Sequence, residues 1–118
     1  MRYSETVSTR EQVGRKEALF REVNERIRDV SESLRTAGGG SGVEFVCECS
    51  RTDCHAPIQL DLEEYESVRE HPAQFVVAPE HVWDEGAEHV VAERRRYWVV
   101  EKVGAAASED VEADPRSR

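Results

Sequence analysis

The sequence lacks any long hydrophobic run. Its longest wholly apolar stretches cover about four residues, as at 97–100 (YWVV), whereas a membrane-spanning helix needs about 20. No apolar stretch follows Arg2 near the beginning of the chain. We therefore expect neither a transmembrane segment nor a secretory signal, and the default compartment is the reducing cytoplasm.

Cysteine is scarce and confined to one place. The 118 residues include three cysteines, all within 47–54. A disulfide-stabilised scaffold favours an even number of cysteines and an oxidising compartment, and this chain is expected to have neither. The cluster therefore points to another use of thiols.

Basic charge is scarce in the middle of the chain. Residues 38–103 contain 6 Lys and Arg against 14 Asp and Glu, and the whole chain has a formal net charge of −9 at pH 7. Nucleic-acid-binding proteins gain affinity by neutralising phosphates with Lys and Arg. We therefore predict no nucleic-acid partner. Three consecutive arginines at 94–96 lie at a predicted hairpin tip, where a charge run is usually just solvated.

The N-terminal third has the periodicity of an amphipathic helix. A capping-box pair, Thr9 with Gln12 or Ser8 with Glu11, precedes it, and the glycine-rich stretch 38–42 ends it. We predict a helical unit within 1–37 and a flexible linker over 38–42. The apolar positions, spaced as on one helical face, are Val13, Leu19, Phe20, Val23, Ile27, Val30 and Leu34.

The remainder of the chain alternates between strand and helix signals. Residues 43–49 have a period of two, which places Glu48 with the polar positions of a half-buried strand. Asp61 and Glu64 form a capping box before a short helix that Pro72 ends. The predicted fold class is α+β: a long N-terminal helix, then a small domain at 43–103 and a disordered acidic tail at 104–118. The domain is predicted to have one helix and a short sheet of about four or five strands, at 43–49, 57–60, 75–78, 88–93 and 97–103.

The three cysteines have a spacing that allows a shared metal ion. Cys47 and Cys49 point to the same side of a strand, and the turn at 50–53 brings Cys54 back toward them. A structural Zn²⁺ site needs four ligands in a tetrahedron, so the fourth should be a histidine. We predict that Zn²⁺ stabilises the domain at 43–103.

Four histidines compete for the fourth position. His81 is favoured because it follows a predicted strand in a loop that can deliver it to a distant site. His55 is second, since it is adjacent to Cys54 and neighbouring side chains diverge in extended chain. His71 lies at a predicted helix end, and His89 lies on a predicted strand. Two further interpretations of the cysteines remain open, namely buried reduced thiols and redox pairing.

The cysteine motif and the segments around it resemble those of a known group of proteins. The stretches at 17–29 (EALFREVNERIRD), 45–82 (FVCECSRTDCHAPIQLDLEEYESVREHPAQFVVAPEHV) and 97–102 (YWVVEK) resemble a family of small uncharacterised proteins of GC-rich bacteria. The resemblance implies the same Cys-x-Cys-x4-Cys set with a Pro-x-His element, here at 79–81. It supplies no activity, and residues 83–87 depart from the family's pattern.

The spacing of apolar residues in the predicted helix bears on partners. Val13, Phe20, Ile27 and Leu34 lie seven residues apart, with Val23 and Val30 between them, so the 10–36 helix is interpreted either as a homodimer seam or as a helix packed on its own domain.

The chemistry favours a small zinc-binding protein that acts as a protein-interaction or regulatory module, with an unidentified protein partner. The alternatives are a thiol and zinc redox switch and a zinc hydrolase or deaminase. Three thiolates and an imidazole leave no open position for water, so an enzyme is disfavoured.

Overall fold

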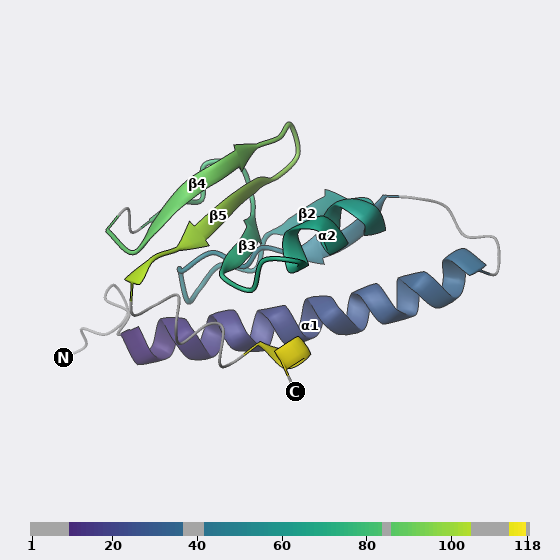
Figure 1. Cartoon of the computed structure of the whole chain (residues 1–118), viewed down its shortest axis with the longest axis horizontal. Coiled ribbons are helices and arrows are strands. Elements are labelled where there is room, and N and C mark those ends of the chain that lie inside the picture. The colour runs from purple at the N-terminus through teal and green to yellow at the C-terminus, as the bar shows by residue number, and fades with distance from the viewer. Residues whose placement is uncertain (1–9, 37–41, 84–85, 105–113, 118) are drawn as a thin grey trace.

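The computed structural model describes residues 10–36, 42–83, 86–104 and 114–117 (Figure 1). Within these ranges the chain is α+β, as predicted, with a long N-terminal helix, two small sheets and a second helix. None of the helices in these ranges offers an apolar stretch that would reach across a membrane. In chain order the elements are α1 (Arg10–Thr36), β1 (Val43–Val46), β2 (Pro57–Leu60), α2 (Leu62–Arg69), β3 (Gln74–Val77), β4 (Glu88–Glu93), β5 (Trp98–Lys102) and the 3-10 turn η1 (Pro115–Ser117).

The five strands of the described ranges form two antiparallel sheets. β1 pairs with β2, and β5 lies between β3 and β4. The segment after β1 is hydrogen-bonded to both sheets: Cys47 N–H donates to Ala56 O (2.8 Å), and Glu48 N–H donates to Val76 O (2.8 Å). Successive amides of extended chain point to opposite edges, so the Cys-Glu-Cys segment joins the two sheets.

Local sequence signals located the shorter elements. At the start of α2, Asp61 N–H donates to Glu64 Oε1 (2.9 Å), which completes the predicted capping box. β4 and β5 form the predicted hairpin, and Arg94 N–H donates to Tyr97 O (2.9 Å) at its turn. The caps, prolines and periodicity of the sequence were therefore sufficient to predict these helices and strands.

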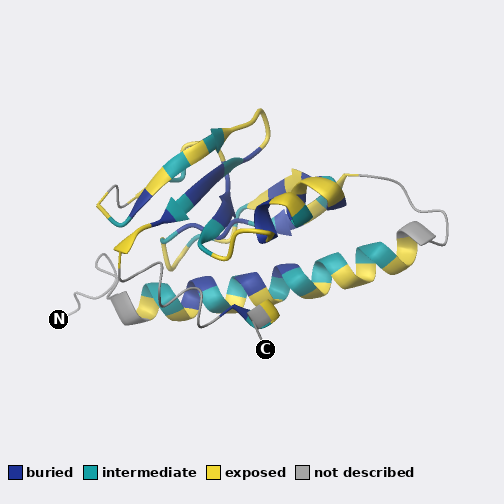
Figure 2. Ribbon diagram, in the orientation of Figure 1, coloured by how far each residue is buried: buried dark blue, intermediate teal, exposed yellow. Residues whose placement is uncertain are grey.

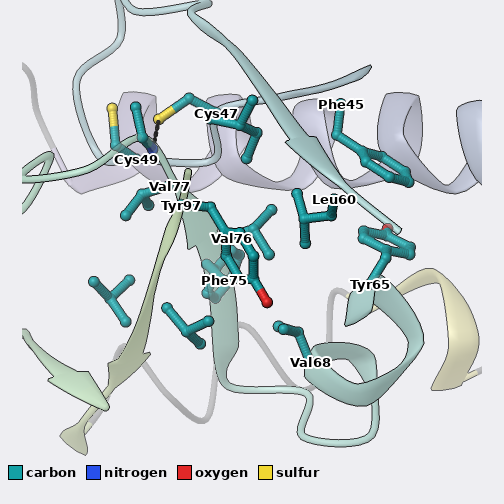
Figure 3. Packing of buried hydrophobic residues seen from close by; sticks show 14 of the residues in the cluster. Phe45, Cys47, Cys49, Leu60, Tyr65, Val68, Phe75, Val76, Val77 and Tyr97 are labelled. Atoms are coloured by element: carbon teal, nitrogen blue, oxygen red, sulfur yellow. Dashed lines mark hydrogen bonds between the residues drawn. The ribbon is translucent and has the colours of Figure 1, made fainter. Parts of the chain in front are cut away.

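The hydrophobic core lies between α2 and the two sheets (Figure 3). Phe45 of β1 stacks on Tyr65 of α2, with ring centroids 4.4 Å apart. Phe75 and Val76 of β3 and Val100 of β5 are buried in the same cluster. Burying each such side chain contributes about 1.5–3 kcal/mol, so this cluster supplies the main apolar stabilisation of the body of the molecule.

α1 packs on this body through polar side chains. Glu17, Arg21 and Asn24 are buried, whereas Val30 and Leu34 are exposed (Figure 2). Buried polar groups need partners, and Glu17 Oε2 lies 2.5 Å from the ammonium nitrogen of Lys102. The helix therefore docks by ion pairs and hydrogen bonds more than by its apolar stripe.

The end of the chain contributes a contact that the sequence did not indicate. Residues 38–41 of the predicted linker and 105–113 of the predicted tail lie outside the described residues. Asp114, however, is buried and forms an ion pair with Arg69 of α2. Arg116 lies 2.7 Å from Glu66 Oε2. The segment 114–117 is thus fastened by charge pairs.

Candidate metal centre

Two connections, the one between β1 and β2 and the loop after β3, bring Cys47, Cys49, Cys54 and His81 together. Cys47 and Cys49 lie in the extended segment after β1, and His81 lies in the loop after β3. Cys54 closes a turn in which its N–H donates to Arg51 O (3.2 Å). The four ligand atoms lie within 4.8 Å of one another, close enough to share one metal ion. These are the four residues named from the sequence.

The distances to the histidine suit a tetrahedral site. His81 Nδ1 lies 3.5 Å from Cys47 Sγ and 3.5 Å from Cys54 Sγ. With Zn–S bonds of about 2.3 Å and a Zn–N bond of about 2.0–2.1 Å, the tetrahedral angle places sulfur and nitrogen about 3.6 Å apart. Equal distances from one ring nitrogen to two sulfurs are those of ligands around a common ion.

A strained backbone position directs His81 toward the sulfurs. The loop turns back after β3, where His81 N–H donates to Ala78 O (3.0 Å). Glu80 has a φ of 70°, in the left-handed region that non-glycine residues rarely adopt. Such positions persist where the surroundings enforce them, and they concentrate at functional sites.

Backbone amides point at two of the sulfurs. Ala78 N–H donates to Cys47 Sγ at 3.1 Å (Figure 3), and the backbone N–H of Arg51 donates to Cys49. Hydrogen bonds to a charged sulfur stabilise the thiolate, which is the form that binds metal. The loop after β3 therefore supplies both a ligand and a donor to another ligand.

The two most buried cysteines share a proton unequally. The Cys47 thiol donates to Cys49, which lowers the pKa of Cys49 to about 4, and the amide of Arg51 and the charge of Lys16 act in the same direction. The same hydrogen bond and burial raise the pKa of Cys47. The hydrogen bond from Cys47 thus favours the thiolate form of Cys49, which is the form that binds metal.

Lys16 of α1 places a buried cation beside the cluster. Its ammonium donates to Cys49 O (2.7 Å) and lies 4.0 Å from Cys49 Sγ. Three thiolates and a neutral imidazole around a divalent cation would carry a net charge of about −1, which this ammonium would offset. Sequence reasoning missed Lys16 because it lies 33 residues before Cys49.

Glu48 departs from its predicted position on the solvent side. It is only 1% exposed, and its carboxylate accepts hydrogen bonds from Asn24 Nδ2 (2.8 Å) and Val76 N–H (3.1 Å). Asn24 also pairs with both backbone groups of Val46 at 2.9 Å, as a neighbouring strand would. The strand predicted over 43–49 ends at Val46, and α1 covers the face on which Glu48 was expected to be exposed.

The other histidines are not part of the cluster. His55, His71 and His89 are exposed and belong to no metal-ligating group in the part of the chain that the structure describes. Trp83 lies against His81, with ring centroids 5.2 Å apart. The geometry therefore favours His81 over His55 as the fourth ligand.

Comparison with known proteins adds no function to this picture. No protein-family model matches the sequence, no curated protein matches it, and no solved structure matches it. The arrangement of the Cys3His cluster is therefore the observation from which function is inferred.

Proposed function

We propose that this protein is a small zinc-binding module in which Cys47, Cys49, Cys54 and His81 bind one Zn²⁺. The observation that carries the proposal is the convergence of four ligand atoms within 4.8 Å, from loops far apart in the sequence. Soft thiolates and an imidazole suit Zn²⁺ better than Mg²⁺ or Ca²⁺, which prefer oxygen ligands.

The proposed role of the zinc is structural. Three sulfurs and one nitrogen complete a tetrahedron, so no position remains for a reactive water, and neither hydrolysis nor deamination is favoured. The ligands come from the segment joining the two sheets and from the loop after β3. Binding one ion there fastens both sheets and adds folding free energy to a small core.

The biological role that we propose is a protein-interaction or regulatory module in a reducing compartment. A structural zinc site holds a surface in shape without consuming substrate, and the protein's charge of −9 favours a partner with basic surface.

Metal analysis combined with unfolding tests the proposal. Purified protein should contain about one zinc per chain, and a chelator should lower its unfolding midpoint. Cys54→Ser and His81→Ala should lose zinc and stability together, while the matched substitutions His55→Ala and His89→Ala should change stability by no more than about 0.5 kcal/mol. Metal-free protein whose unfolding does not respond to zinc or chelator would exclude the proposal.

A thiol switch is the second candidate because one ligand is accessible. Cys47 and Cys49 are buried, but Cys54 is partly exposed. Peroxide can oxidise an accessible thiolate to a sulfenic acid, with water formed from the peroxide, and a second cysteine can condense with it to a disulfide. Zinc release by mild peroxide and its rebinding after reduction, both followed with a colorimetric chelator, would favour the switch. Retention of zinc under the same conditions would favour the static site.

A further inference from the structure

An apolar seam runs along the C-terminal half of α1. We define it as Val23, Ile27, Val30 and Leu34, whose spacings of four, three and four residues are those of a coiled-coil seam. Val30 and Leu34 are each 60% exposed. Exposed apolar side chains at this spacing suit another helix. A hollow of about 350 Å³ on this side of α1 is lined by Val23, Arg26, Ile27, Val30 and Ser31.

Val30, in the exposed part of the seam, is turned away from Arg21, one of the residues that dock α1. Arg21 is buried and donates to Pro72 O (2.6 Å). Val30 follows nine residues later, which is two and a half helical turns, so it points to the opposite side of the helix. The body of the molecule therefore contacts one side of α1, including Ile27 at the edge of the seam, and leaves Val30 and Leu34 exposed.

We propose that the seam binds the seam of a second copy of this chain, with the two helices antiparallel. The N-terminal half of the heptad pattern is already occupied, because Lys16 is buried under its own domain and donates to Cys49 O. In a parallel dimer, the bodies of the two chains would lie side by side, because each covers the N-terminal half of its own α1. In an antiparallel dimer, the two bodies lie at opposite ends, so the C-terminal halves of the two helices can overlap.

The seam is complementary to itself in this orientation. Antiparallel pairing sets Val23 against Leu34 of the partner subunit and Ile27 against Val30 of the partner subunit. The two-fold axis repeats both layers, so four apolar layers form from four residues. Because the same apolar layers form when the seam is paired with itself in reverse, a second copy of this chain is favoured as its partner.

Charges beside the seam are complementary in the same register. Arg26 and Asp29 lie on one side of the seam, and both are exposed, although Asp29 also lies 3.1 Å from Arg28 of its own helix. The two-fold axis brings Arg26 to the level of residues 29–33 of the partner subunit, within reach of the partner's Asp29. Each copy supplies one cation and one anion, so two ion pairs form across the axis.

The energetics predict a weak dimer. α1 is already ordered by its own domain, so association does not have to pay for helix formation. The overlap covers only residues 23–34, however, and interfaces below about 1,200 Å² are usually weak or transient. Dimers should therefore appear at micromolar and higher concentrations.

Sedimentation equilibrium of the full chain, from about 5 to 500 μM, tests the proposal. The average mass should rise toward two chains, and Val30→Glu or Leu34→Glu should lower the association constant at least about tenfold by burying a charge. The matched control is Val91→Glu, at a 42% exposed apolar residue on β4. A chain that stays monomeric, or dimerises equally with Val30→Glu, overturns the proposal. Unchanged zinc content in these variants keeps the outcome separate from the metal site.

Charge exchange tests the orientation. Arg26→Glu and Asp29→Arg should each weaken the dimer several-fold, because each sets like charges together across the axis. The double variant should regain the association constant of the natural sequence. Parallel helices do not bring these two residues together, so failure of the double variant to recover would overturn the antiparallel arrangement.

Discussion

At the scale of single residues, the Cys3His cluster is held by side chains from a distant part of the chain. Lys16 and Asn24 of α1 bond to the backbone on either side of the Cys-Glu-Cys segment. Glu48 turns inward between the two cysteines and ties the segment to Val76. Groups of this kind orient metal ligands and tune their affinity although they do not touch the ion.

Replacing Lys16 with Gln should weaken zinc binding. The ammonium lowers the pKa of Cys49, so its loss raises that pKa, and the pH at which zinc is half released should move upward. Loss of an outer partner typically costs about 10–100-fold in metal affinity. Competition with a chromophoric chelator between pH 5 and 8 measures both effects.

A matched substitution separates charge from general damage. Arg95→Gln removes an exposed cation from the β4–β5 turn and should leave zinc affinity unchanged. If Lys16→Gln and Arg95→Gln retain equal affinity and equal pH profiles, the ammonium has no role at the site.

The residues of the Cys3His cluster were predictable because their chemistry is local. The side chains that support the cluster were not predictable. Cys47, Cys49 and Cys54 lie in one short motif, and a loop histidine completes a familiar set. Glu48 was predicted to face solvent but is buried, because the period-two argument assumes a sheet with one face exposed to solvent. A pairing across more than 20 residues, such as Asn24 with Glu48, leaves no periodic signal in a single sequence.

At the scale of elements, the helices and strands were predictable but their docking faces were not. Capping at Asp61 and the hairpin around Arg94 are local, so the sequence located them. Helical periodicity identified the apolar stripe of α1 without saying what it contacts. The body offers carbonyl groups and carboxylates to α1, and residues such as Arg21 satisfy them, so the polar face docks.

The segment at 114–117 gives an element-scale prediction. Asp114→Ala should destabilise the protein by about 3 kcal/mol, because Arg69 keeps its buried charge and loses one of its two acidic partners. Burial opposes ionisation of Asp114, but the hydrogen bonds from Arg69 outweigh it and lower its pKa. This stabilisation is complete above the unfolded pKa of about 3.9 and is lost as pH falls through the lower folded value.

Denaturant unfolding at several pH values checks the prediction for Asp114→Ala. The difference between the natural sequence and Asp114→Ala should be constant near neutrality and should shrink below about pH 4. Asp53→Ala, which removes a carboxylate from an exposed ion pair with Arg51, should cost no more than about 1 kcal/mol. Equal effects of the two substitutions would mean that the 114–117 segment is not docked in solution.

At the scale of the whole molecule, α1 contacts the Cys3His cluster through one set of residues and exposes another set to solvent. Lys16 and Asn24, in its N-terminal and middle turns, support the metal centre, and Val30 and Leu34, near its C-terminal end, face solvent. Zinc binding and self-association are therefore expected to vary independently. Acidic charge dominates the chain as a whole, at −9.

This charge predicts that double-stranded DNA does not bind. The basic run at 94–96 is exposed, but it lines a hollow of about 260 Å³ together with Asp61 and Glu64, whose negative charge disfavours phosphate there. Three cations facing two carboxylates provide few phosphate contacts, and affinity depends on their number. Fluorescence anisotropy of a labelled duplex at about 150 mM salt should stay flat up to high micromolar protein. Binding that weakens steeply with salt and disappears when Arg94, Arg95 and Arg96 are replaced by Gln would show that the hairpin tip, rather than the net charge, governs the interaction.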